Sequence, residues 1–225
     1  MGASKKSSQK LPQELVPFNS EDKDYHQKED LNDRGNFPSP VICCIFGNVI
    51  CGKSRTIKNV LCHKTPHYER IVIYTVLNNT QEYKTIDHEL ADEVPSLDFF
   101  DPEVRNCLIF EDISPKELSK KEQSNISKLL RLGASHHNID IYCITQDPTS
   151  LLTTMRRLCN VVIMWRNNDL LQLSTLCNKF NLPKGTLKHI FTNVCTHRCD
   201  SFTISDITPS CRYRKNICEP IEIQL

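Results

Sequence analysis

The sequence lacks several features that would place it at once in a familiar class of protein. No apolar segment reaches the about 18 residues that a membrane-spanning helix needs, and residues 1–40 hold no apolar run typical of a secretory signal. The formal net charge is only +1, so the whole-chain charge indicates no partner. We therefore expect an intracellular protein with no membrane partner. Any nucleic-acid surface has to be a local patch.

Cysteine, by contrast, is abundant, with 12 residues. Several lie inside apolar runs such as VICCIF and IYCIT, where thiols behave as small buried hydrophobic groups in a reducing compartment. A second group lies near the C-terminus. Its C-x-H-x-C spacing is tighter than that of ordinary zinc ligands, so we favour free thiols over a metal site. The group comprises Cys195, His197, Cys199, Cys211 and Cys218.

The chain divides into three parts by composition. Residues 1–38 form a flexible polar arm, residues 39–218 one domain, and residues 219–225 a C-terminal tail. Within the domain, nearly continuous apolar runs predict strands that are buried on both faces, as in a parallel sheet. The predicted strands are 41–46, 70–74, 107–111, 139–145, 160–165 and 199–207.

Helical stretches alternate with these strands. The predicted helices are 52–65, 115–133, 148–158, 168–180 and 184–192, with Ser114 as N-cap of the second, whereas 76–106 is mostly loop. Strands that alternate with helices favour a three-layer α/β fold with a mostly parallel central sheet.

A phosphate-binding motif follows the first predicted strand. Residues 47–54, GNVICGKS, fit the pattern G-x-x-x-x-G-K-[ST] without a mismatch, and a predicted helix follows them. Backbone N–H groups of such a loop and the helix N-terminus bind phosphates. The motif lysine reaches the β- and γ-phosphates and the motif hydroxyl binds Mg²⁺. The predicted nucleotide-binding residues are Gly47, Asn48, Val49, Ile50, Cys51, Gly52, Lys53, Ser54 and Arg55.

The stretch CLIFEDI, residues 107–113, carries two carboxylates at the end of its strand. We expect this strand to neighbour the P-loop strand. Glu111 and Asp112 are candidates to hold Mg²⁺ and to polarise the attacking water. Gln146 directly follows the strand IDIYCIT and is a candidate γ-phosphate sensor. Arg156 and Arg157 lie ten and eleven residues further on, where one of them is a candidate arginine finger for a neighbouring subunit and the other a solvated surface residue.

The order of these motifs resembles that of the FtsK/HerA superfamily of P-loop translocases. Within it, the chain is similar to viral genome-packaging ATPases of the poxvirus type and their relatives in adenovirus-like elements (Maverick/Polinton, adintovirus, virophage). The resemblance covers about residues 38–215 and rests on GNVICGKS, LIFEDI, LLRLGASHHNIDIYCITQDP and MRRLCNVVIMW. Two departures are Glu111 where Asp is usual, and Gly133-Ala134-Ser135-His136, which lacks an expected basic residue.

The resemblance implies that residues 39–218 form a P-loop ATPase domain with the three-layer P-loop NTPase fold of the RecA/FtsK-like type. It implies an ATP- and Mg²⁺-dependent motor that moves double-stranded DNA into a capsid. Its roles map onto Lys53 and Ser54 for nucleotide and Mg²⁺, Glu111 for Mg²⁺, Asp112 for catalysis, Gln146 for sensing, and Arg156 or Arg157 as finger. It implies a homo-oligomeric ring of six subunits and a capsid or portal vertex protein as partner. It also implies a location in the host nucleus or a cytoplasmic virus factory, or association with the virion.

Two other functions remain open from the sequence. A stand-alone P-loop NTPase or kinase would need a lid of arginines, and no Arg lies between 167 and 193. A nucleotide-binding scaffold without turnover is compatible with Glu111. For DNA contact we favour the basic residues near the C-terminus over those of the predicted helix 115–133. The first group is Lys179, Lys184, Lys188, Arg198, Arg212, Arg214 and Lys215; the second is Lys116, Lys120, Lys121, Lys128 and Arg131.

Overall fold

The structure is a computed structural model of the whole chain. It describes residues 37–76, 83–148, 151–166, 178–208 and 211–223. The predicted N-terminal arm up to residue 36 and most of the predicted helix 168–180 lie outside the described residues. Within the described residues, no helix has the length and apolar character needed to cross a membrane.

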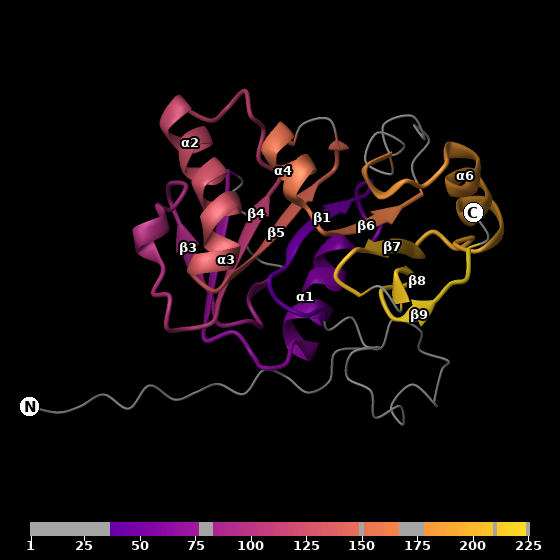
Figure 1. Cartoon of the computed structure of the whole chain (residues 1–225), viewed down its shortest axis with the longest axis horizontal. Coiled ribbons are helices and arrows are strands. Elements are labelled where there is room, and N and C mark those ends of the chain that lie inside the picture. The colour runs from indigo at the N-terminus through magenta and orange to yellow at the C-terminus, as the bar shows by residue number, and fades with distance from the viewer. Residues whose placement is uncertain (1–36, 77–82, 149–150, 167–177, 209–210, 224–225) are drawn as a thin grey trace, which may run out of the picture.

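A nine-stranded, mostly parallel sheet forms the centre of the fold and confirms the predicted fold class (Figure 1). Its strand order is β3-β2-β4-β5-β1-β6-β7-β8-β9. The six strands from β3 to β6 run parallel, and β7, β8 and β9 add to β6 in antiparallel fashion. The strands are β1 Ile42–Phe46, β2 Arg70–Thr75, β3 Glu89–Ala91, β4 Asn106–Glu111, β5 Ile139–Thr145, β6 Val161–Trp165, β7 Ser201–Ser205, β8 Tyr213–Lys215 and β9 Glu219–Pro220.

Helices cover both faces of this sheet, which makes three layers. Figure 1 shows α1 on one side and α2 and α4 on the other. The helices are α1 Lys53–His63, α2 Lys120–Lys128, α3 Ala134–His136, α4 Thr153–Leu158 and α6 Lys184–Asn193. The π-helical segment η5, Leu129–Gly133, joins α2 to α3, and 3-10 turns lie at Leu97–Phe99 (η4) and Asn178–Phe180 (η7).

The strand sequences explain this layering. Successive residues of β1 point to opposite faces, and both sets are buried. Cys44 and Phe46 belong to the core cluster that includes Ile126 of α2, whereas Cys43 and Ile45 belong to the cluster that includes the buried side of α1. A strand buried on both faces is mostly apolar, which is why these runs do not alternate between apolar and polar residues.

Helix α2 begins five residues later than the sequence analysis predicts. Its N-cap is Ser119, whose hydroxyl accepts from the N–H of Glu122 at 3.2 Å, while the Glu122 carboxylate accepts from the N–H of Ser119 at 2.7 Å. This reciprocal pair is a capping box. The prediction of Ser114 as N-cap is therefore wrong, because the S-x-x-E pattern at 119–122 outcompetes the Ser-Pro pair upstream.

Three short strands lie in segments for which we expected none. β3 falls within the predicted loop 76–106, β8 within the basic segment after the last predicted strand, and β9 within residues 219–225. Each spans only two or three residues, so none carries a readable periodicity. The sheet is consequently three strands wider than the sequence predicts.

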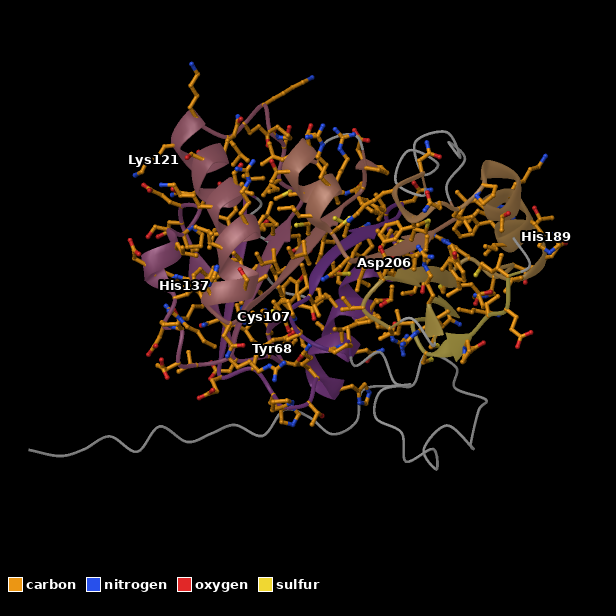
Figure 2. All side chains as sticks on the ribbon, in the orientation of Figure 1. Tyr68, Cys107, Lys121, His137, His189 and Asp206 are labelled. Atoms are coloured by element: carbon orange, nitrogen blue, oxygen red, sulfur yellow. The ribbon has the colours of Figure 1, made fainter. Side chains whose placement is uncertain are left out.

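A buried polar network closes the amino end of the sheet. Lys64 Nζ lies 2.9 Å from Asp140 Oδ2 and also donates to the carbonyl of Phe37. Asp140 accepts in addition from Val41 N and from Tyr68 Oη, each at 2.8 Å. Figure 2 labels Tyr68 in this region. Burial lowers the pKa of Lys64, and the nearby Asp140 carboxylate opposes that shift. The network fixes the segment that leads into β1.

Candidate functional site

The loop after β1 follows the path that a P-loop requires. The N–H of Gly47 donates to the carbonyl of Thr145 in β5 at 3.4 Å, so the loop leaves the sheet at the carboxyl ends of the parallel strands. Helix α1 begins at Lys53, directly after Gly52, which has φ 111°. Glycine adopts this left-handed conformation without a steric penalty. Strand, loop and helix therefore have the arrangement that the motif predicts.

The floor of this loop is made by Trp165, the only tryptophan in the chain. A Cβ on Gly47 would lie 2.3 Å from Cys51 Sγ and 3.1 Å from Trp165 Cε3, so only glycine fits there. The indole Nε1 of Trp165 donates to the carbonyl of Cys199 at 3.0 Å, which fixes the ring. Burial raises the pKa of the Cys51 thiol, with the charge of Lys53 acting in the opposite direction.

Lys53 is folded back onto its own loop. Its Nζ donates to the carbonyls of Gly47 at 2.7 Å and Asn48 at 3.0 Å. The loop thus cradles its own ammonium group in this conformation. A bound triphosphate would offer Lys53 stronger, charge-assisted hydrogen bonds, so nucleotide binding is expected to draw the side chain away from these carbonyls.

The tip of the loop is apolar and exposed. Val49 is 61% exposed and Ile50 is 78% exposed. Ile50 has φ 63°, an uncommon conformation for a β-branched residue. Arg55 is exposed in the first turn of α1, whereas Ser54 is partly buried there. Both follow Lys53 directly, so both lie at the helix end that favours anions.

The predicted carboxylates lie at the same edge of the sheet. Glu111 ends β4 and is partly buried. Asp112 follows with φ 47°, and its N–H donates to the carbonyl of Ile144 in β5 at 2.8 Å. Its Oδ2 accepts from Gln146 Nε2 at 3.3 Å. The structure therefore brings the predicted catalytic carboxylate and the predicted sensor into contact.

The expectation that the carboxylate strand neighbours the P-loop strand is wrong. β5 lies between β1 and β4 and pairs with both. Gln146, at the end of β5, consequently stands between the loop at 47–52 and the carboxylate at 112. Gln146 is thus the polar side chain that follows the strand between the P-loop strand and the carboxylate strand.

The two arginines of α4 are not brought to the P-loop of their own chain. The helix ends next to Asn160, whose N–H donates to the carbonyl of Ile42 at the start of β1. The P-loop leaves β1 at its other end. Arg156 donates through Nη2 to Thr153 Oγ1 at 3.4 Å, and Arg157 is exposed.

The basic group near the C-terminus is partly engaged within the chain. Arg212 Nη2 lies 2.9 Å from Asp206 Oδ1, Lys215 Nζ lies 3.3 Å from Asp200 Oδ2, and Arg214 is buried. These residues hold β7 and β8 together. Our preference for this group as the DNA surface is therefore weakened. On and beside α2, by contrast, Lys116, Lys120, Lys121, Lys128 and Arg131 are all exposed.

The cysteines and histidines gather into no metal centre among the residues that the structure describes. None of the described cysteines forms a disulfide, and Cys195 and Cys218 are buried. His136 is exposed at the end of α3.

For Mg²⁺, the carboxyl edge offers the hydroxyl of Ser54 and the carboxylates of Glu111 and Asp112. This is an all-oxygen set of the kind that Mg²⁺ prefers.

The sequence analysis missed Trp165 as a site residue. An aromatic residue at the end of a strand carries no sign that it lies beneath a loop more than a hundred positions earlier. The register of β1 with β6 places it there: Phe46 pairs with Met164, so the next residue of β6 lies beside Gly47.

The fold and this loop define the chain as having the P-loop NTPase fold, with a carboxylate strand separated from the P-loop strand by one further strand. No protein-family model matches the sequence, and no curated protein matches it. Solved structures do share the fold.

Two of these structures are of B204. B204 is described as the genome-packaging NTPase of Sulfolobus turreted icosahedral virus 2, in complex with ATP-gammaS. It has a TM-score of 0.54 and 15% identity, over 81% of this chain and 98% of that chain. The DNA-packaging ATPase B204 from Sulfolobus turreted icosahedral virus has a TM-score of 0.55 and 16% identity, over 80% of this chain and 97% of that chain.

A third structure is the monomer form of the pCW3 conjugation coupling protein TcpA with ATPgS. Its TM-score is 0.50 and its identity 11%, over 80% of this chain and 60% of that chain. Identities this low establish the shared fold alone.

Proposed function

We propose that this protein is an ATP hydrolase that drives the translocation of double-stranded DNA during viral genome packaging. The single observation that carries the proposal is the contact between Gln146 and Asp112 at the carboxyl edge, in the same fold and at the same edge as the P-loop. The likeness to B204, a packaging NTPase, supports the same function.

Nucleotide binding is assigned to residues 47–55. Backbone N–H groups of the loop and the first turn of α1 would face the phosphates, and Lys53 would exchange its loop carbonyls for β- and γ-phosphate oxygens. Ser54 and Glu111 would hold Mg²⁺, which supplies charge neutralisation on the phosphates when bound. Glu has one more methylene than the usual Asp, so its carboxylate reaches about one bond length further.

Asp112 is assigned as the group that activates water. A water molecule attacks the γ-phosphorus, the bond to the β-phosphate oxygen breaks, and the water proton passes toward the Asp112 carboxylate. Gln146 fixes the orientation of that carboxylate through its hydrogen bond. Arg156 or Arg157 would complete the site in trans, since neither lies at the P-loop of its own chain.

The proposed motor function also requires partners. We assign a homo-oligomeric ring of six subunits, a capsid or portal vertex protein, and sequence-independent contact with DNA phosphates. The exposed basic residues on and beside α2 would supply such contacts. The sites of action would be the host nucleus, a cytoplasmic virus factory or the virion.

The test is ATP turnover with and without duplex DNA, in the wild type and in Lys53→Ala. We expect turnover that DNA stimulates, that EDTA abolishes, and that Lys53→Ala loses. Turnover without DNA stimulation would instead indicate a stand-alone NTPase or kinase. Binding of ATP without turnover would indicate a scaffold. DNA-stimulated turnover that survives Lys53→Ala would show that the site assignment is wrong. Trp165 fluorescence checks that each variant is folded.

A further inference from the structure

The edge of the sheet at β3 carries a surface rich in carboxylates. Residues 85–104, which include β3 and η4, contain seven Asp or Glu residues and no Lys or Arg. All seven acidic residues are exposed. We call this region the β3 surface. Its acidic residues are Asp87, Glu89, Asp92, Glu93, Asp98, Asp101 and Glu103.

The β3 surface contains the strand that ends the sheet. β3 is the first strand in the sheet order and pairs with β2, and no other described strand pairs with it. Figure 1 shows β3 at one end of the molecule, away from β7, β8 and β9. An edge strand presents backbone N–H and C=O groups to which a further strand can add. Natural proteins often block such an edge with Lys or Pro, and Glu89–Ala91 contains neither.

The opposite edge of the sheet, at β9, carries such a block. The N–H of Ile221 donates to the carbonyl of Tyr213 in β8 at 2.9 Å. Because successive residues of an antiparallel strand turn their backbone groups to opposite sides, position 220 faces away from β8. Pro220 stands at this position and has no N–H to donate. Of the two edges, the β3 edge is therefore the one suited to receive a further strand.

Arg70 of β2 holds the β3 surface in a defined shape. It donates from Nε and Nη2 to the two carboxylate oxygens of Glu89, at 3.1 and 2.8 Å, and from Nη1 to the carbonyl of Phe99 at 2.6 Å. Its guanidinium also lies 4.1 Å from the centre of the Phe99 ring. One side chain thus contacts both β3 and η4, so the surface is formed before any partner binds.

A cavity beside β3 offers an apolar contact. Its volume is about 420 Å³, within the range of ordinary ligand pockets. Leu90 and Phe99 line it and are 54% and 42% exposed. Asp92, Glu93 and, from α2, Lys121 also line it. A ligand that fits this cavity and the surface around it combines an apolar side chain with positive charge.

The charge of the β3 surface selects among the possible occupants. Duplex DNA is disfavoured, because the carboxylates repel phosphates. The same surface of a second copy is disfavoured as well, because the contact would bring two sets of seven carboxylates together. An extended segment that carries Lys or Arg is attracted instead, since its charge is complementary.

We propose that the β3 surface is a docking site for an extended basic segment of another protein, which adds to the sheet as a strand beside β3. The segment's backbone pairs with β3, and one apolar side chain enters the cavity against Leu90 and Phe99. Its Lys or Arg side chains meet carboxylates such as Asp92 and Glu93. In this mode of recognition main-chain hydrogen bonds give affinity and side-chain contacts give specificity. The site is separate from the nucleotide chemistry and requires neither ATP nor contact between copies.

The test is fluorescence anisotropy with the full chain at physiological ionic strength and without nucleotide. The probe is the labelled peptide Lys-Val-Lys-Leu-Lys-Val-Lys, which we expect to bind. The same peptide with a methyl group on every backbone nitrogen keeps its charge but loses its N–H groups. Its binding should be weaker by about 10-fold or more, because it cannot pair as a strand. The peptide with Glu in place of each Lys should not bind.

Two pairs of variants locate the site on the chain. Glu93→Lys should weaken binding of the basic peptide about 10-fold by like-charge repulsion. Glu222→Lys, an exposed reversal of the same sign after β9, should bind as the wild type does. Leu90→Ser should weaken binding about 10-fold through the lost apolar contact. Leu158→Ser on α4, where Leu158 is 37% exposed, should leave binding unchanged.

The proposal is overturned if the wild type does not bind the basic peptide, or binds the methylated or the acidic peptide equally well. Equal effects of a test variant and its matched control also overturn it. So does a synthetic peptide of residues 1–18 that binds more tightly than the probe, because the occupant is then this chain's own N-terminal segment, with Lys5, Lys6 and Lys10. ATP turnover of the same samples keeps the two proposals apart: DNA-stimulated turnover without peptide binding contradicts the docking site alone.

Discussion

Gly47→Ala is the substitution whose effect can be worked out most directly from the structure. The added methyl would lie 2.3 Å from Cys51 Sγ and 3.1 and 3.3 Å from Cε3 and Cβ of Trp165. The first distance is far below van der Waals contact. Because Cys51 is a short side chain in a buried position, it has little freedom to move aside. The loop, and with it the indole, must shift.

The size of the effect follows from known costs of overpacking. Inserting a methyl into a well-packed site costs about 1–3 kcal/mol. Cys51→Ala alone removes one buried heavy atom, which costs about 1 kcal/mol. In the double variant the new methyl occupies the space that the sulfur leaves. The double variant should therefore lose less than the sum of the single changes, with a coupling of about 1 kcal/mol or more.

The assay is urea unfolding followed by Trp165 fluorescence, in a double-mutant cycle. Trp165 lies beneath the loop and is the only tryptophan, so the same signal reports unfolding and the position of the loop. Gly47→Ala paired with Ser119→Ala, on a different element, is the matched control and should be additive. If Gly47→Ala and Cys51→Ala add within about 0.5 kcal/mol, the packing of the sulfur against Gly47 is refuted.

Three further predictions concern other parts of the chain. Ser119→Ala should lower the free energy of unfolding by about 1 kcal/mol through loss of the capping box. Hydrogen bonds from Ser119 hold the pKa of Glu122 below its usual value. The stabilisation by the capping box is therefore present above the unfolded pKa of about 4.3 and is lost as the pH falls through the lower folded pKa. Urea titrations should show a smaller cost of Ser119→Ala at pH 3 than at pH 7, and an equal cost at pH 3 would contradict the linkage. Lys64→Met should cost about 3–5 kcal/mol in thermal or urea unfolding, because it leaves Asp140 buried without its cation, and a cost under 1 kcal/mol would show that the pair is not buried in solution. Gln146→Ala should keep ATP binding but reduce turnover at least about 10-fold by releasing Asp112; unchanged turnover in a single-turnover assay would exclude Gln146 from the site.

Much of the fold could be predicted because its central strands are buried on both faces. A strand such as β6, with the sequence VVIMW, is buried along its whole length, so its run of apolar residues is easily recognised. The P-loop was equally readable, since a fixed spacing of Gly, Lys and Ser precedes a helix. The short strands β3, β8 and β9 could not be predicted, because two or three residues at the edge of a sheet show no periodicity.

The relative placement of the site residues could be predicted only in part. The end of each strand was recognisable, so Asp112 and Gln146 were both expected near the nucleotide. Strand order, however, depends on packing between distant segments, and no local pattern shows that β5 separates β1 from β4. The start of α2 was misplaced for a different reason. The capping box at Ser119 and Glu122 was present in the sequence, but the Ser-Pro pair before it is also a good helix start.

The sequence also does not show which charged residues are free to form a surface. The basic residues near the C-terminus are close in sequence and look like one surface, yet Arg214 is buried and Arg212 and Lys215 pair with Asp206 and Asp200. Pairing of this kind depends on the antiparallel register of β7 and β8, which the sequence does not reveal. The acidic residues of 85–104 were visible one by one, but their position at the sheet edge required the strand order.

The measurement that tests the central claim most directly is displacement of a triplex-forming oligonucleotide from duplex DNA. A protein that translocates along the duplex strips the third strand as it passes. We expect displacement by the wild type that requires ATP and Mg²⁺ and stops with Lys53→Ala. Full ATP turnover and DNA binding by the wild type without any displacement would contradict the account of this protein as a DNA motor.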